Sequence, residues 1–148
     1  MVRNATNEEV DFYERHLYPF QDAVLGNFDS KGFYLTGGTC LARYYYYHRF
    51  SDDLDFFFDG ANGTLEDFEF EYNRIVQSIN FEIKSTISDK YFKRLMLTSN
   101  GVDLKMEFVY ENYPRLADFQ REQGLLVDSK ENVATNKITA VQGRKAEK

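Results

Sequence analysis

Two aspartates, Asp53 and Asp55, are separated by one apolar residue at the start of an apolar segment that continues into three phenylalanines. Side chains alternate along a β-strand, so the two carboxylates would point to the same face of a strand. Carboxylates with this spacing can direct oxygen atoms at one hard cation such as Mg²⁺. A strand end that simply places acidic side chains in water has the same sequence, so the pair alone does not identify a metal site.

A third carboxylate lies on a later segment in which apolar and polar residues alternate, namely Leu104, Met106 and Phe108 against Asp103, Lys105 and Glu107. The alternation predicts a strand with one apolar and one polar face. Either Glu107 or Asp103 could join the aspartate pair; we favour Glu107, because Met106 and Phe108 flank it within the strand. Three carboxylates around Mg²⁺ or Mn²⁺ suit metal-assisted phosphoryl or nucleotidyl transfer.

A glycine turn, Gly37-Gly38-Thr39, follows a short apolar run. Glycines let the backbone approach a phosphate closely, and the start of a helix offers free N–H groups. An ordinary tight turn would have the same sequence. No Gly-Lys-Ser/Thr follows, so the turn is not a P-loop.

The pattern along the chain alternates between helical and strand periodicity. Thr6 with Glu9, and Thr64 with Asp67, are typical of capped helix starts, and Pro19 should kink the first helix or start a second one. Asn100-Gly101 predicts a hairpin turn. We expect helices at about 6–26, 39–48, 64–79 and 128–142, and strands at 33–36, 54–58, 81–87, 91–98 and 102–109.

This order of elements predicts a mixed α/β (α+β) fold with an antiparallel-rich sheet flanked by helices. The first two strands would place the glycine turn and the aspartate pair at the same sheet edge. The 148 residues correspond to one domain, and we find no internal boundary. The chain stops in a polar, helix-compatible run, so we expect a following helical portion to be absent from it.

Composition narrows the classes of protein. One cysteine, Cys40, cannot form an internal disulfide and fits a reducing compartment. No apolar run approaches the roughly 18 residues of a membrane span, and residues 1–10 lack the apolar core of a signal peptide. We therefore expect a cytoplasmic protein without a membrane partner. The net charge of −6 argues against a protein that coats nucleic acid, but not against a nucleotide held through metal ions.

The segment GGTCLARYYYYHRFSDDLDFF resembles the signature GGT-x-L…HR-x-S-x-DLDFF of the AbiEii-like nucleotidyltransferases. These are toxins of type IV toxin–antitoxin and abortive-infection systems, within the DNA polymerase β-like superfamily. The likeness continues loosely through residues 104–108 and 136–144. The matching positions are Gly37, Gly38, Thr39, Leu41, His48, Arg49, Ser51, Asp53, Leu54 and Asp55.

The resemblance implies a fold, an activity and a set of roles. Asp53, Asp55 and Glu107 would bind the metal and perform catalysis. A nucleoside triphosphate would be held by Gly37, Gly38, Thr39, Arg49, Ser51 and Lys137. The acceptor would be a molecule such as the 3′ end of a transfer RNA, and a cognate antitoxin would be a partner.

Some residues keep a structural alternative. Arg49 could pair with Asp52 or Asp53 instead of a phosphate, and Lys137 could lie in solvent. Relative to the superfamily, Gly-Gly replaces Gly-Ser, and Glu107 replaces the more usual aspartate. The RD-x-x-DL pattern that usually follows the later helix is absent. Two other functions therefore stay open: a nucleotide-binding or protein-interaction module without turnover, and transfer to a small molecule.

Overall fold

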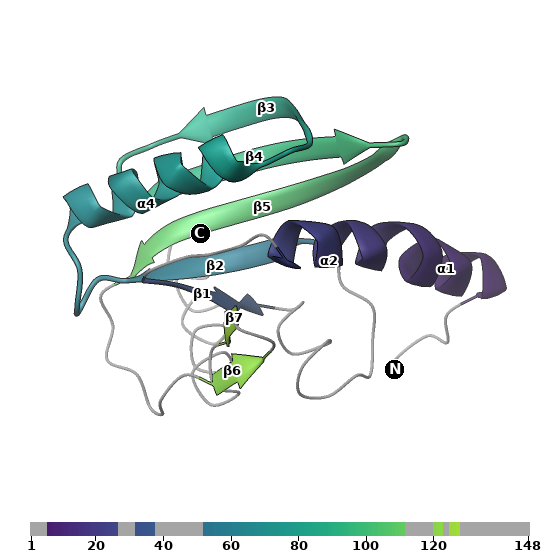
Figure 1. The fold of residues 1–148 in the computed structure, drawn as a ribbon, viewed down its shortest axis with the longest axis horizontal. Coiled ribbons are helices and arrows are strands. Elements are labelled where there is room, and N and C mark those ends of the chain that lie inside the picture. Colours follow the sequence, from purple (N-terminus) through teal and green to yellow (C-terminus); the bar gives the residue numbers. More distant parts are fainter. Residues whose placement is uncertain (1–5, 27–31, 38–51, 112–119, 123–124, 128–148) are drawn as a thin grey trace, which may run out of the picture.

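In the computed structural model, the described residues are 6–26, 32–37, 52–111, 120–122 and 125–127. Within these residues, seven strands form one sheet in the order β3-β4-β5-β2-β1-β7-β6, with helices packed against it (Figure 1). None of the helices in this part of the chain combines the length and apolar character that a membrane crossing requires. The helices expected at 39–48 and 128–142 lie outside the described residues.

The five strands predicted from the sequence are confirmed, and their ends shift by two residues at most. They are β1 (Phe33–Thr36), β2 (Leu54–Asp59), β3 (Glu82–Ser88), β4 (Phe92–Ser99) and β5 (Val102–Glu111). The sequence prediction missed two short strands, β6 (Gln120–Glu122) and β7 (Leu125–Val127). Three residues are too few to give a periodic signal, which explains the omission.

The sheet is mixed and rich in antiparallel pairs, as expected. Antiparallel pairing joins β1 to β2, β3 to β4, β4 to β5 and β6 to β7. Parallel pairing joins β2 to β5 and β1 to β7. The β4–β5 hairpin turns at Asn100 and Gly101, which both have positive φ, as the Asn-Gly signal predicts.

The first helical segment runs from Asn7 to Gly26 but is not a regular α-helix throughout. α1 (Asn7–Phe12) begins with the expected capping box between Thr6 and Glu9. A π-helical stretch, Tyr13–Leu17, follows, and α2 (Tyr18–Gly26) then contains Pro19 in its first turn. Proline has no N–H to donate to the preceding turn, and it is tolerated where a helix begins. From the sequence, Pro19 is expected to kink the helix or to start a second one; the chain stays helical here, and Pro19 is the second residue of α2, after the π-helical stretch.

The helix between β2 and β3, α4 (Leu65–Ser78), also begins with its predicted capping box. The Thr64 hydroxyl accepts from the Asp67 amide at 3.1 Å, and the Asp67 carboxylate accepts from the Thr64 amide at 2.9 Å. Phe68, Tyr72 and Ile75 are buried on one side of this helix.

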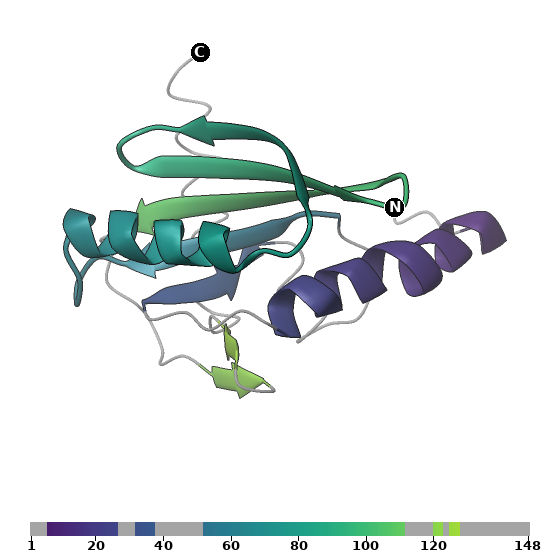
Figure 2. The same cartoon turned by 45° about the horizontal axis from the view of Figure 1, so that its top comes forward.

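One face of the sheet forms the core, and both helical segments cover that face (Figure 2). Every second residue of β2 and β5 is buried, as expected for strands with one apolar face, because side chains alternate between the two faces of a sheet. The fully buried side chains of the core strands include Leu54, Phe56, Leu104, Met106 and Phe108. The residues between them, including Asp55 and Glu107, lie on the opposite face. The candidate site therefore lies on the face of the sheet opposite the core.

Candidate functional site

The first glycine of the predicted turn, Gly37, lies directly against Asp55. Gly37 follows β1 with a φ of +76°, a conformation that favours glycine. A β-carbon at Gly37 would lie 3.0 Å from the Asp55 Cβ and 3.1 Å from its Cγ, and closer still to Oδ2. Only a residue without a side chain lets the backbone pass this close to the carboxylate. The expected juxtaposition of turn and aspartate is therefore present at Gly37.

Strand register places Asp55 between the turn and the third carboxylate. Asp55 is opposite Thr36 on β1 and opposite Glu107 on β5. Residues paired across neighbouring strands project from the same face of a sheet. Asp55 and Glu107, which are 52 residues apart in the sequence, are thus neighbours on the polar face.

A lysine side chain, that of Lys105, lies between the carboxylates of Asp53 and Glu107. The Lys105 Nζ is 3.2 Å from Asp53 Oδ2 and 3.3 Å from Glu107 Oε1. The hydrogen bond to Asp53 is the largest cause that raises the pKa of Lys105 above its usual value, and Glu107 adds to it. The ammonium group therefore stays charged at neutral pH. Sequence reasoning gave Lys105 no role, although its place two residues before Glu107 puts both on the same strand face.

A second cation borders the site from β4. Arg94 is opposite Glu107 in the strand register, and its Nη2 is 3.5 Å from Glu107 Oε2. Among the described residues, Arg94 Nε is buried without a hydrogen-bond partner. Arg94 had no role in the sequence analysis either. Its position in β4 gives no signal until the β4–β5 register is known.

The residue before the aspartate pair ties the site to the first helical segment. The Tyr13 hydroxyl donates a hydrogen bond to Asp52 Oδ1. Burial and this hydrogen bond raise the pKa of Tyr13 above its usual value. The fully buried Gln21 donates from Nε2 to the Asp52 carbonyl oxygen at 3.2 Å. These contacts fix the start of β2, and with it the position of Asp53.

The alternative third carboxylate, Asp103, has a different partner. Its Oδ2 is 3.0 Å from Lys84 Nζ on β3, and the hydrogen bond from Lys84 holds the pKa of Asp103 below its usual value. Asp103 precedes Glu107 by four residues and is opposite Thr98 in the strand register. The register to Asp55 favours Glu107, whose role stays a prediction.

The described residues contain no cluster of three or more His, Cys, Asp or Glu side chains arranged to hold a metal ion. Asp53, Asp55 and Glu107 share one sheet face, but the Lys105 ammonium lies between Asp53 and Glu107. The other predicted nucleotide-binding residues lie outside the described residues: Gly38, Thr39, Arg49, Ser51 and Lys137.

Comparison with protein families gives a match over most of the chain. Residues 23–148 match the family described as nucleotidyl transferase AbiEii toxin, type IV toxin–antitoxin system. The chain belongs to this family. The resemblance in the sequence around the glycine turn and the aspartate pair is therefore confirmed. A search of the curated proteins found no match.

Solved structures of other proteins have a fold similar to that of this chain. JHP933 from Helicobacter pylori has a TM-score of 0.61 and 21% identity. The nucleotidyltransferase toxin MenT4 (Rv2826c) from Mycobacterium tuberculosis H37Rv has a TM-score of 0.56 and 20% identity. Each comparison covers 93% of this chain and 59% of the other. The chain thus spans about three fifths of the length of these structures, and the likeness establishes the fold.

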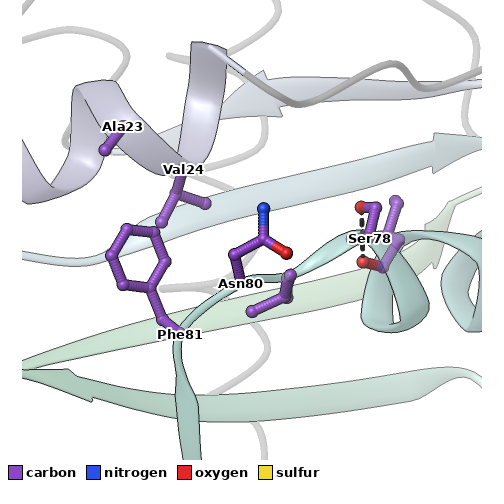
Figure 3. Close-up of a pocket in the computed structure, with 7 residues that line it drawn as sticks. Ala23, Val24, Ser78, Asn80 and Phe81 are labelled. Atoms are coloured by element: carbon purple, nitrogen blue, oxygen red, sulfur yellow. Dashed lines mark hydrogen bonds between the residues drawn. The ribbon is translucent and has the colours of Figure 1, made fainter.

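A pocket elsewhere on this AbiEii-family chain is separate from the carboxylates. It lies where α2 meets the end of α4 and the start of β3, among Val24, Ile79 and Phe81 (Figure 3). Ser78 Oγ is engaged with the Ile75 carbonyl oxygen at 2.8 Å. The Phe81 ring packs 4.9 Å from the Phe20 ring. None of the residues that line this pocket belongs to the carboxylate site.

Proposed function

We propose that the chain is a metal-dependent nucleotidyltransferase that moves a nucleoside monophosphate from a nucleoside triphosphate to an acceptor. The observation that carries the proposal is the position of Asp55, which contacts the Gly37 turn on one side and is in register with Glu107 on the other. A phosphate-binding turn and metal-binding carboxylates are the two parts that such a transfer needs in one place. Family membership supports the same chemistry.

The donor atoms of this sheet face are of the type that binds Mg²⁺ or Mn²⁺, although the described side chains do not surround a common point in this structure. All three side chains offer carboxylate oxygens, the ligands that hard divalent cations prefer. Two of them, Asp53 and Glu107, already share a cation, the Lys105 ammonium. Asp53, Asp55 and Glu107 would hold the divalent ion, which when bound neutralises phosphate charge and orients the triphosphate.

The remaining residues of the site bind the triphosphate and activate the acceptor. The Gly37-Gly38-Thr39 turn binds the triphosphate through backbone N–H groups, helped by Arg49, Ser51 and Lys137. Glu107 orients or deprotonates the acceptor hydroxyl. The acceptor oxygen forms a bond to the α-phosphorus, the bond from that phosphorus to the bridging oxygen breaks, and pyrophosphate leaves.

We propose that the acceptor is the 3′ end of a transfer RNA, and that the transfer makes the protein a toxin which a cognate antitoxin counteracts. Family membership supports the toxin and its antitoxin, because the family is one of type IV toxin–antitoxin systems. A cytoplasmic location goes with this role, since transfer RNA and nucleoside triphosphates are found there. We further propose that residues 1–148 act as one nucleotidyltransferase domain.

A transfer assay tests the proposal. The purified chain is incubated with Mg²⁺, each α-labelled nucleoside triphosphate, and transfer RNA, total protein or aminoglycoside-type small molecules as acceptors. We expect label on transfer RNA, and a loss of at least 100-fold in Asp53→Ala. The matched control is Asp103→Ala, which removes an exposed aspartate of the same sheet face and should keep activity.

Three outcomes contradict parts of the proposal. Label on a small molecule alone would replace the acceptor. Nucleotide binding without transfer would favour a binding module on the same fold. Equal transfer by wild type and Asp53→Ala would refute the assignment of the site.

A further inference from the structure

Lys105 occupies the position between two of the three carboxylates in which a shared cation would be expected. Its Nζ lies 3.2 Å from Asp53 Oδ2 and 3.3 Å from Glu107 Oε1, so one ammonium group contacts both. Lys105 itself lies on β5, two residues before Glu107, and shares its strand face. Such a contact uses the oxygen atoms that a divalent ion would need.

From this geometry we propose that Lys105 is a built-in counter-ion which a divalent metal ion must displace to bind Asp53 and Glu107. The proposal rests on the proposed function, because it concerns the same carboxylates. Lys105 stabilises the carboxylates in the metal-free protein, and it sets the concentration of metal at which the site fills.

Charge and reach support an exchange of this kind. Asp53, Asp55 and Glu107 carry three negative charges, and Lys105 and Arg94 bring two positive charges to them among the described residues. A divalent ion placed beside both cations would be repelled by each. Lysine is a flexible chain with a point charge at its end, so its ammonium can leave while the β5 backbone stays in place. Arg94 contacts only Glu107 of the three, at the longer distance of 3.5 Å.

The charge at position 105 should therefore determine metal affinity. Removing one positive charge a few ångströms from a divalent ion at a partly exposed site should strengthen binding roughly tenfold. An uncharged side chain at this position also removes the ammonium group that lies between Asp53 and Glu107 in the metal-free protein. Metal binding should then raise the melting temperature more than it does in wild type.

The test measures Mn²⁺ affinity through the electron paramagnetic resonance signal of free Mn²⁺, together with the melting temperature in EDTA and in Mn²⁺. We expect Lys105→Met to bind Mn²⁺ about tenfold more tightly than wild type, and Lys105→Arg to stay within about threefold of it. Lys84→Met is the matched control. It removes a strand lysine that pairs with Asp103 at 3.0 Å, and it should leave Mn²⁺ affinity unchanged.

Unchanged or weaker Mn²⁺ binding by Lys105→Met would overturn the proposal, since Lys105 would then be a purely structural partner or an aid to the site. If Lys105→Met does not fold, the side-chain ammonium signals of the wild-type protein give the same answer. Addition of Mg²⁺ should shift the Lys105 signal, assigned by its loss in Lys105→Arg, and leave that of Lys84 in place. A Lys105 signal that Mg²⁺ binding does not move would refute displacement.

Failure here can be distinguished from failure of the proposed function. If the wild-type protein transfers nucleotide but binds Mn²⁺ with the same affinity as Lys105→Met, the proposed function stands and the proposed role of Lys105 is wrong. If Lys105→Met binds Mn²⁺ more tightly but the wild-type protein transfers no nucleotide, the role of Lys105 stands and the proposed nucleotidyltransferase activity is wrong.

Discussion

Replacing Gly37 with alanine should damage both the stability of the protein and its site, for two separable reasons. The first is conformational: Gly37 has a φ of +76°, and a left-handed backbone costs a residue with a β-carbon about 1–2 kcal/mol. The second is steric. The new methyl group would lie 3.0 Å from the Asp55 Cβ and closer to its carboxylate, so the side chain or the turn must move. Overpacking of this kind costs about 1–3 kcal/mol.

Gly101 provides a matched control within the same chain. Its φ of +78° is nearly that of Gly37, but no atom lies within 4 Å of a β-carbon built at that position. Gly101→Ala therefore carries the conformational cost alone, and the effect of alanine on the unfolded chain is the same in both variants. We expect Gly37→Ala to be less stable than Gly101→Ala by about 1–3 kcal/mol.

Urea denaturation followed by circular dichroism measures the two free energies of unfolding, and the transfer assay measures the two activities. Gly101→Ala should keep near wild-type transfer, whereas Gly37→Ala should lose most of it because Asp55 is displaced. Equal destabilisation in the two variants, with equal activity, would refute the close approach of the turn to Asp55.

Two further predictions concern contacts that hold the helices on the sheet. Lys93 is 3% exposed, and its Nζ pairs with Glu69 at 2.7 Å. Glu69→Ala leaves a buried ammonium with one partner fewer, so it should lower the free energy of unfolding, measured by urea denaturation, by about 1–3 kcal/mol. Lys93→Met should stay within about 1 kcal/mol of wild type. A larger loss of stability in Lys93→Met than in Glu69→Ala would contradict this. The raised pKa of Tyr13 means that the folded state holds its proton more tightly than the unfolded state, so the stability from this group is complete below pH 10 and falls as the pH rises above it. Thermal melts from pH 9 to 11 should show a steeper loss in wild type than in Tyr13→Phe, and parallel curves would refute the role of the hydroxyl.

Local patterns in the sequence predicted most of the elements. The capping boxes at Thr6 and Thr64 depend on residues three positions apart, so both helix starts could be read directly. The strands of the Asn100–Gly101 hairpin have short-range alternation and a turn signal of their own. The π-helical stretch before Tyr18 was not foreseen, because its bonds depend on how the turn before Pro19 accommodates the missing donor.

The pairing of distant strands could not be derived from such patterns. β2 and β5 are parallel neighbours, and three elements separate them in the chain. Only their register makes Asp55 and Glu107 neighbours and brings Lys105 to Asp53. The sequence shows that Lys105 and Glu107 share a strand face, but it does not show which strand lies beside β5. The contact of Lys105 with Asp53 and Glu107 depends on that neighbour, so it could not be predicted.

A crystal structure with Mn²⁺ and a non-hydrolysable nucleoside triphosphate, with the ion located by its anomalous scattering, would test the proposed metal site directly. We expect Mn²⁺ with oxygen atoms of Asp53, Asp55 and Glu107 at about 2.0–2.2 Å, the distance typical of small divalent ions. We also expect the triphosphate against the Gly37 turn and the Lys105 ammonium away from Asp53. An ion bound elsewhere, or one held by Asp103 in place of Glu107, would contradict the proposed site.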